Sequence, residues 1–226
     1  MNSSDLYIAN MNISDYEKLI TNLHVKQQCF TTKRKTWEGA EKKIDWLASF
    51  NDNLFNGNQS ISISRKDIFE TENIRQKIIK TIYWGYPNGM RGPNFVSILT
   101  DIEIIEKSLD KIKQVHEPSA KDFYDLKNVF KNVKGLGLST YSKLLYFFQI
   151  SIDKNPCLIL DQRLIDVFAS KAYSEFHELE KISYGISAEN NYLHFLNLTN
   201  QLSEKLRTNG ENIEQFLFIF GKNLSE

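Results

Sequence analysis

The sequence predicts an all-α fold. Apolar residues recur at helical spacing along almost the whole chain, and serine–acid capping patterns precede several of these runs. Neither a repeat nor a low-complexity tract interrupts the pattern. With 226 residues, of which 41% are apolar, the chain can bury a substantial core. We expect a single unit over residues 1–226, built from an N-terminal helical part (1–92), a core (93–172) and C-terminal helices that pack back (173–226).

In the N-terminal part we expect helices at about 14–24, 36–50 and 64–83. Ser14 with Glu17, and Ser64 with Asp67, have the spacing of a helix-opening cap. The loop 51–60 separates the second helix from the third. Residues 60–64, "SISIS", alternate like a short strand, but no partner for such a strand is evident.

The segment "WGYPNGMRGP" (84–93) carries three glycines and two prolines, which predicts turns. Beyond it we expect helices at about 94–114, 119–130 and 139–150, a helix headed by Asp161, and helices at about 190–207 and 211–221. Ser119 with Asp122 opens the second of these helices.

Charge and cysteine usage exclude several classes of protein. Lysine plus arginine equals aspartate plus glutamate, so bulk charge alone would not hold this chain on nucleic acid. Cys29 and Cys157 lack a CxxC partner, so we expect reduced thiols and no metal site built from side chains. Without a signal-like segment or an apolar run of membrane-spanning length, we expect a cytoplasmic protein with no membrane partner.

The stretch "VKGLGLSTYSKLL" (133–145) places Gly135 and Gly137 between two helices. Glycines allow a tight turn and a close approach to another surface. The restarted helix would leave unpaired N–H groups near its first turn, which suits a phosphate, and Lys134 and Lys143 flank the turn. A turn that serves packing alone is the commoner use of two glycines, and both interpretations stay open on this motif by itself.

Three segments resemble one superfamily of DNA-repair enzymes. Residues 133–145 look like the helix-hairpin-helix of the endonuclease III and 8-oxoguanine glycosylase superfamily, and "PCLILDQRLIDVF" (156–168) looks like the segment after that hairpin, where an aspartate opens a helix. "NIEQFLFIFGK" (212–222) resembles a late helix of the same fold. The resemblance covers about 119–172 and the last helix. It implies two intertwined helical lobes with a cleft, and a monomer that acts on double-stranded DNA near the nucleoid.

By this resemblance Asp161 would stabilise the positive sugar of the transition state; the alternative is a plain N-cap. Ser139 stands where lyase-active members carry a Schiff-base lysine, which implies a monofunctional enzyme that uses water; it could also merely cap the helix. Lys143, one turn later, could supply a displaced amine nucleophile, or could be a phosphate contact or a surface lysine.

An enzyme that cuts a base from DNA must also grip the strand and hold the extruded base. The expected DNA contacts are Lys134, Gly135, Gly137, Ser139, Thr140 and Arg91, with Asn88 and Met90 as further wedge candidates. The expected base pocket consists of Trp84, Tyr86 and Phe147, with Tyr146 as a further candidate. For the aromatic residues the alternative is an ordinary place in the core, and for 87–89 an ordinary turn.

Two further expectations follow from the resemblance. No organic cofactor is implied, but members often hold a monovalent cation on the hairpin carbonyls. Tyr141 replaces a residue that is usually small, which implies an altered pocket or an outward side chain. The leading interpretation is thus a monofunctional DNA glycosylase, with weak AP-lyase activity left open. By resemblance 8-oxoguanine is the default base, while a hypermodified base in foreign DNA and an RNA substrate are equally open. A non-catalytic DNA-binding module of the same fold and a helical interaction domain are the alternatives.

Overall fold

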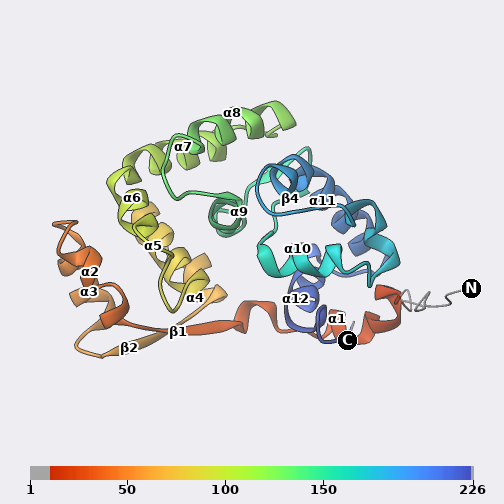
Figure 1. Cartoon of the computed structure of the whole chain (residues 1–226), viewed down its shortest axis with the longest axis horizontal. Coiled ribbons are helices and arrows are strands. Elements are labelled where there is room, and N and C mark those ends of the chain that lie inside the picture. Colours follow the sequence, from red (N-terminus) through yellow and green to blue (C-terminus); the bar gives the residue numbers. More distant parts are fainter. Residues whose placement is uncertain (1–10, 225–226) are drawn as a thin grey trace, which may run out of the picture. The chain divides into compact units, whose positions relative to one another are not determined.

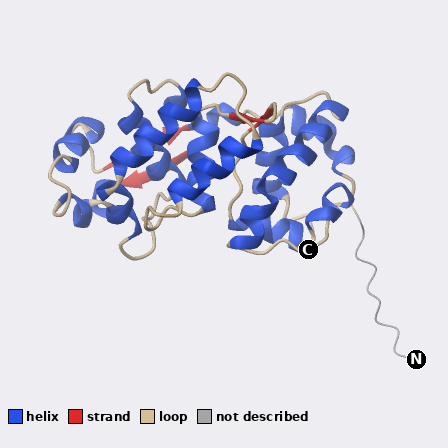
Figure 2. Cartoon of the chain, turned by 90° about the horizontal axis from the view of Figure 1, so that it is seen from above, coloured by secondary structure: helices blue, strands red, loops and turns tan. Residues whose placement is uncertain are grey.

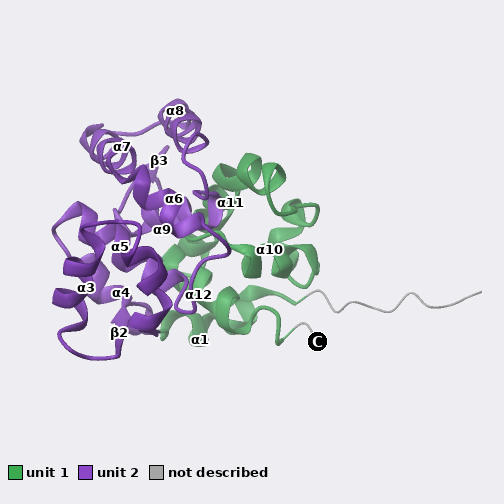
Figure 3. Cartoon of the chain, turned by 60° about the vertical axis from the view of Figure 1, so that its left-hand side comes forward, with its two compact units in different colours: residues 1–23, 158–226 green, residues 24–157 purple. Residues whose placement is uncertain are grey.

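A computed structural model describes residues 11–224 of the chain. Helices dominate it, which confirms the predicted all-α class, and strands form only two short ribbons in the described part (Figures 1 and 2). The chain divides into two compact units, coloured in Figure 3. One comprises His24–Cys157. The other combines the chain up to Leu23 with the chain from Leu158 onward.

The unit His24–Cys157 begins with a helical turn, η2 (Val25–Gln27), and strand β1 (Cys29–Lys33). Its remaining elements, in chain order, are η3 (Arg34–Thr36), α2 (Glu38–Glu41), α3 (Leu47–Phe55), β2 (Ser60–Ser64), α4 (Arg65–Phe69), α5 (Ile74–Gly85), α6 (Asn94–Thr100), α7 (Ile102–Gln114), α8 (Ala120–Phe130), α9 (Leu138–Phe147), β3 (Ser151–Ile152) and β4 (Asn155–Pro156). Helix α5 packs against α9, and α7 packs against α8.

The stretch "SISIS" is a strand whose partner lies 31 residues upstream. Strand β2 pairs antiparallel with β1, with Cys29 opposite Ser64 and Lys33 opposite Ser60. The partner sequence, "CFTTK", is too short to show a clear alternation by itself, and only the folded chain brings the two strands together. The ribbon anchors the start of α4, because Ser64 ends the strand and caps the helix.

Three expected helices are interrupted. The expected helix 64–83 consists of α4 and α5, because the Asn73 side chain accepts a hydrogen bond from the Gln76 amide (3.0 Å) and begins a new helix. The expected helix 94–114 divides at Asp101 into α6 and α7. The expected helix 36–50 divides likewise, and its second half, α3, continues to Phe55 into the expected loop.

Two of the three predicted capping boxes are present, and one is wrong. Ser64 with Asp67 and Ser119 with Asp122 form reciprocal capping boxes, as expected. The predicted cap at Ser14 is wrong. The chain enters a 3₁₀ turn, η1 (Ile13–Tyr16), one residue earlier, so Ser14 lies inside the turn, and its buried hydroxyl has no hydrogen-bond partner among the described residues.

The second unit is built from both ends of the described chain. It contains η1, α1 (Glu17–Thr21), α10 (Gln162–Ala169), η4 (Ser174–Leu179), α11 (Ile186–Lys205) and α12 (Gly210–Phe220). Helix α1 packs on α12, where the buried Asn212 side chain donates to the carbonyls of Ile20 (2.9 Å) and Leu23 (3.3 Å). The unit boundaries therefore fall at 23/24 and 157/158, whereas the sequence suggested divisions at 92/93 and 172/173.

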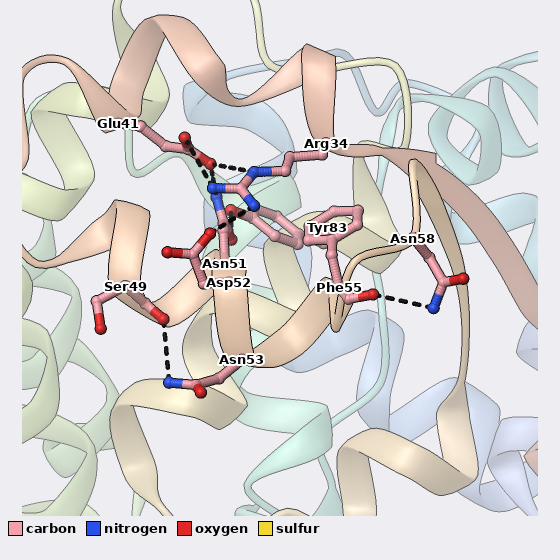
Figure 4. Close-up of polar contacts among 9 residues, drawn as sticks. All are labelled: Arg34, Glu41, Ser49, Asn51, Asp52, Asn53, Phe55, Asn58 and Tyr83. Atoms are coloured by element: carbon pink, nitrogen blue, oxygen red, sulfur yellow. Dashed lines mark hydrogen bonds and ion pairs between the residues drawn. The ribbon is translucent and has the colours of Figure 1, made fainter.

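A network of hydrogen bonds and ion pairs links side chains from α2, α3 and α5 with Arg34 (Figure 4). Arg34 lies between Glu41 (3.2 Å) and Asp52 (2.6 Å). Asn51, fully buried, donates to Glu41 (2.6 Å) and accepts from the hydroxyl of Tyr83 (2.8 Å). Burial raises the pKa of the Tyr83 hydroxyl well above its ordinary value, so this hydroxyl remains a donor across the physiological range.

We expect Asn51→Ala to lower the free energy of unfolding by about 2 kcal/mol, because the Tyr83 hydroxyl and Glu41 would each lose a buried partner. Asn53→Ala is the matched control on the same helix. Asn53 is exposed and donates only to the Ser49 carbonyl, so its loss should change stability by less than about 0.5 kcal/mol. Urea denaturation measures both, and equal effects would contradict the role given to the network.

Candidate active site

In the hairpin between α8 and α9, Gly135 occupies a position that no other residue could fill without cost. Gly135 has φ +87°, and a Cβ there would lie 2.9 Å from both the Cα and the Cβ of Asn94 at the start of α6. The left-handed backbone and the lack of space are independent requirements for glycine. The predicted tight turn and close approach are both present, and Asn94 is the surface that Gly135 approaches.

Helix α9 begins without a side-chain cap. Gly137 is its N-cap, in extended conformation, and the Gly137 carbonyl accepts from the amides of Thr140 (2.9 Å) and Tyr141 (3.0 Å). Within residues 11–224, by contrast, the amides of Gly135, Gly137, Leu138 and Ser139 donate no hydrogen bond. Such a cluster of unpaired donors at the positive end of a helix suits an anionic oxygen. Lys134, beside the turn, is exposed.

The hairpin also carries carbonyl oxygens of the kind that a monovalent cation takes. In the described part of the chain, no hydrogen bond reaches the carbonyls of Lys134, Gly135 and Leu136. These oxygens fit the cation that the resemblance implies, and they would hold it through main-chain atoms alone. Among the described residues no group of histidine, cysteine, aspartate and glutamate side chains could bind a metal ion.

Four of the predicted site residues meet at the first turns of α9. The Tyr86 hydroxyl lies 2.7 Å from Thr140 Oγ1 and donates to Ser139 Oγ (3.3 Å). Lys143 is buried, and its Nζ donates to the Ser139 carbonyl (2.8 Å) and to Ser139 Oγ (3.1 Å). The same Nζ lies 5.3 Å from the centroid of the Tyr86 ring. Lys143 is therefore no surface lysine.

Two of the three expected pocket aromatics lie in the core instead of lining an open surface. Phe147 is fully buried and its ring centroid lies 5.3 Å from that of Trp84. Trp84, also buried, donates from Nε1 to the Gln28 carbonyl (3.3 Å) and faces the guanidinium of Arg65. Tyr146, the further candidate, is buried in the same cluster. Tyr86 is the half-buried one.

The turn-rich segment after α5 is ordered by its own hydrogen bonds. The amide of Gly89 donates to the Tyr86 carbonyl (2.8 Å), and Thr32 on β1 donates to the Pro87 carbonyl (2.9 Å). Asn88 and Arg91 are exposed, while Met90 is half-buried. The segment thus holds two polar wedge candidates at its surface.

Asp161 belongs to the other unit, where it caps α10. Its Oδ1 accepts from the amides of Arg163 (3.0 Å) and Leu164 (3.4 Å), and its side chain is partly exposed. The predicted N-cap is therefore present, and a role in catalysis is compatible with it. Tyr141 stands where the resemblance expects a small residue, and its side chain lies inside the protein. It is buried, with its ring centroid 6.0 Å from that of Phe130.

A helix-hairpin-helix with a capping aspartate on the next helix defines a class of DNA-repair folds, and the comparison with known families agrees. Residues 23–218 match the family model described as "Putative 8-oxoguanine DNA glycosylase OGG-like protein". The chain belongs to this family, as the resemblance predicted. No protein with a curated description matches the chain, and no solved structure does. None of the helices in the described range is long and apolar enough to cross a membrane.

Sequence reasoning missed two residues of this site. Asn94 meets the backbone of Gly135, and Gly85 borders the side chain of Lys143. Gly85 was visible as the first glycine of the turn-rich segment, but its spatial role was not, because 58 residues separate it from Lys143. Asn94 carried no signal of its own beyond following a proline.

We expect Gly135→Ala to destabilise the protein more than Gly57→Ala does. Both glycines have positive φ, but a Cβ at Gly57 meets no atom within 4 Å, so Gly57→Ala costs the backbone strain alone, about 1 kcal/mol. Gly135→Ala adds the overlap with Asn94, for a total of about 3 kcal/mol. Denaturant unfolding of the two variants side by side measures the difference, and equal losses would refute the close approach.

Proposed function

We propose that this protein is a DNA glycosylase that excises a damaged or modified base by hydrolysing its N-glycosidic bond. The observation that carries the proposal is the uncapped start of α9, where four hairpin amides have no acceptor among the described residues. These amides would bind a phosphate of double-stranded DNA by direct hydrogen bonds, which suits a chain with zero net charge. Lys134 and Arg91, both exposed, would add charge at the backbone.

In this proposal Asp161 carries the chemistry. The bond between C1′ and the base nitrogen breaks, its electron pair leaves with the base, and the sugar becomes positively charged. The carboxylate stabilises that charge, and a water oxygen then bonds to C1′. The proton that this water loses ends on the departed base, which balances the hydrolysis and leaves an abasic site. The two amides that hold Asp161 Oδ1 fix the direction of the side chain.

Ser139 supports a monofunctional reaction. A hydroxyl cannot form the imine that a lysine at this position would form, so water remains as the nucleophile. The Lys143 amino group is engaged with the oxygens of Ser139, which favours a supporting role over attack on the sugar. A monovalent cation on the hairpin carbonyls would supply further positive charge beside the bound phosphate.

The proposed base is 8-oxoguanine, because the family description names it. Tyr86 is the half-buried aromatic at the hairpin and is the residue that we propose for contact with the extruded base. A panel of duplexes, each with one modified base, tests this choice: alkali-labile breaks at 8-oxoguanine support it, and breaks only at another base would replace it.

We expect Asp161→Asn to reduce base excision by at least about 100-fold while duplex binding and stability are retained. Asparagine caps a helix as well as aspartate does, so unfolding free energy should change by less than about 0.5 kcal/mol. Asp166→Asn is the control on the same helix, where Asp166 only accepts from Gln162. Duplex binding without excision by the wild-type protein on every substrate would identify a DNA-binding module instead.

We expect no covalent adduct when the wild-type protein is incubated with substrate duplex and borohydride, because borohydride traps only an imine between an amine and C1′. Gel electrophoresis detects such an adduct by its reduced mobility. An adduct that disappears in Lys143→Gln would overturn the water route and assign the nucleophile to the Lys143 amine.

A further inference from the structure

Gly85 gives Lys143 the space to reach Ser139. A Cβ at position 85 would lie 2.7 Å from Cδ and 2.9 Å from Cε of Lys143, and non-bonded carbon atoms do not approach this closely. Gly85 is the last residue of α5 and has no positive φ, so its backbone does not require glycine. The Lys143 methylenes occupy the place of a Cβ, so a side chain at position 85 would displace the end of Lys143.

Tyr86 holds the other side of the same amino group. Its ring lies 5.3 Å from Lys143 Nζ, at the distance of a cation–π contact. A lysine amino group beside the N-terminus of its own helix opposes the helix dipole, and its burial adds a desolvation cost. The two oxygens of Ser139 and the Tyr86 ring offset these costs, so the amine has a defined place at the start of α9.

These contacts determine what the Ser139 hydroxyl can do. Its oxygen accepts from Lys143 Nζ (3.1 Å) and from the Tyr86 hydroxyl (3.3 Å), and the Tyr86 oxygen in turn can accept from Thr140 Oγ1 (2.7 Å). A hydroxyl has two lone pairs and one proton. With both lone pairs facing donors, Ser139 keeps only its proton for a further partner. Ser139 is half-buried, and its own amide donates to no acceptor in the described chain.

We infer that Gly85 and Tyr86 are positioning residues, which hold the Lys143 amine on Ser139 and so fix the Ser139 hydroxyl as a hydrogen-bond donor to a backbone phosphate of the bound DNA. The inference rests on the proposed function and deepens it. An oxygen that only donates cannot take a proton from the attacking water, so Ser139 is a phosphate contact and not a general base. The hydroxyl extends the row of hairpin amides by one side-chain donor.

The first experiment measures the position of the amine without DNA. Labelling with an amine-reactive ester, followed by peptide mass spectrometry, gives a rate for each lysine. Gly85→Ala should raise the rate at Lys143 several-fold, because the clash falls on the flexible end of that side chain and displaces it. The rate at the exposed Lys134 serves as the internal reference. Gly39→Ala is the matched control, since a Cβ there meets no atom within 4 Å, and it should leave Lys143 unchanged.

The second experiment tests the coupling to Ser139 by a double-mutant cycle on duplex affinity at fixed salt. Ser139→Ala and Gly85→Ala should each raise Kd by roughly 3–10-fold, and the double variant should be no weaker than either single one. If Gly85→Ala fails to fold, Tyr86→Leu replaces it in the labelling experiment, because it removes the ring beside the amine. Lys143→Gln, which removes the amine itself, replaces it in the affinity cycle, because Tyr86 is also the proposed contact for the base.

The outcomes separate the two proposals. Unchanged labelling of Lys143 in both Gly85→Ala and Tyr86→Leu overturns the positioning role, whatever the DNA results. Additive effects of Gly85→Ala and Ser139→Ala on Kd overturn the link to the hydroxyl. Wild-type protein that binds no duplex removes the proposed function, while the labelling result still tests the placement of the amine.

Discussion

The approach of the hairpin backbone to Asn94 is the constraint on which the rest of the candidate site depends. Gly135 has no side chain, and this lets the turn between α8 and α9 lie against the start of α6. The position of this turn sets where α9 begins, and therefore which amides remain without an acceptor among the described residues. A side chain at position 135 would move the turn, and the donors would move with it. Under the proposed function, packing and phosphate binding would therefore depend on the same residue, and the two uses of a glycine turn considered from the sequence would not exclude each other.

Helix class and several helix starts could be predicted because they depend on neighbours in sequence. The capping boxes at Ser64 and Ser119 and the cap at Asp161 involve side chains two or three residues from their partners. Two features could not be predicted in full. The alternation at Ser60–Ser64 indicated a strand, but its partner β1 is distant in sequence. The cap at Ser14 was wrong for a local reason, because a 3₁₀ turn begins one residue before it. Pairing across 31 residues leaves no local signal.

The candidate site likewise combines features that depend on sequence neighbours with features that depend on packing. The hairpin, Ser139 and Asp161 could be picked out by motif spacing, while the burial of Lys143 and its contact with Gly85 depend on the packing of α5 against α9. Aromatic residues illustrate the point well. Trp84 and Tyr86 stand two positions apart in sequence, yet one is sealed against Arg65 and Phe147 and the other reaches the hairpin hydroxyls. Composition could not distinguish them.

The division of the chain into units has a consequence for biosynthesis. One unit is a continuous stretch, so all its parts have left the ribosome once residue 157 has emerged, and it can fold during translation. The other needs α1 and α12, which lie at opposite ends of the described chain, and Asn212 can contact Ile20 only after residue 212 has emerged. The early segment must wait, unpaired, for its late counterpart. The unit that carries the hairpin is thus fully synthesised before the unit that carries Asp161.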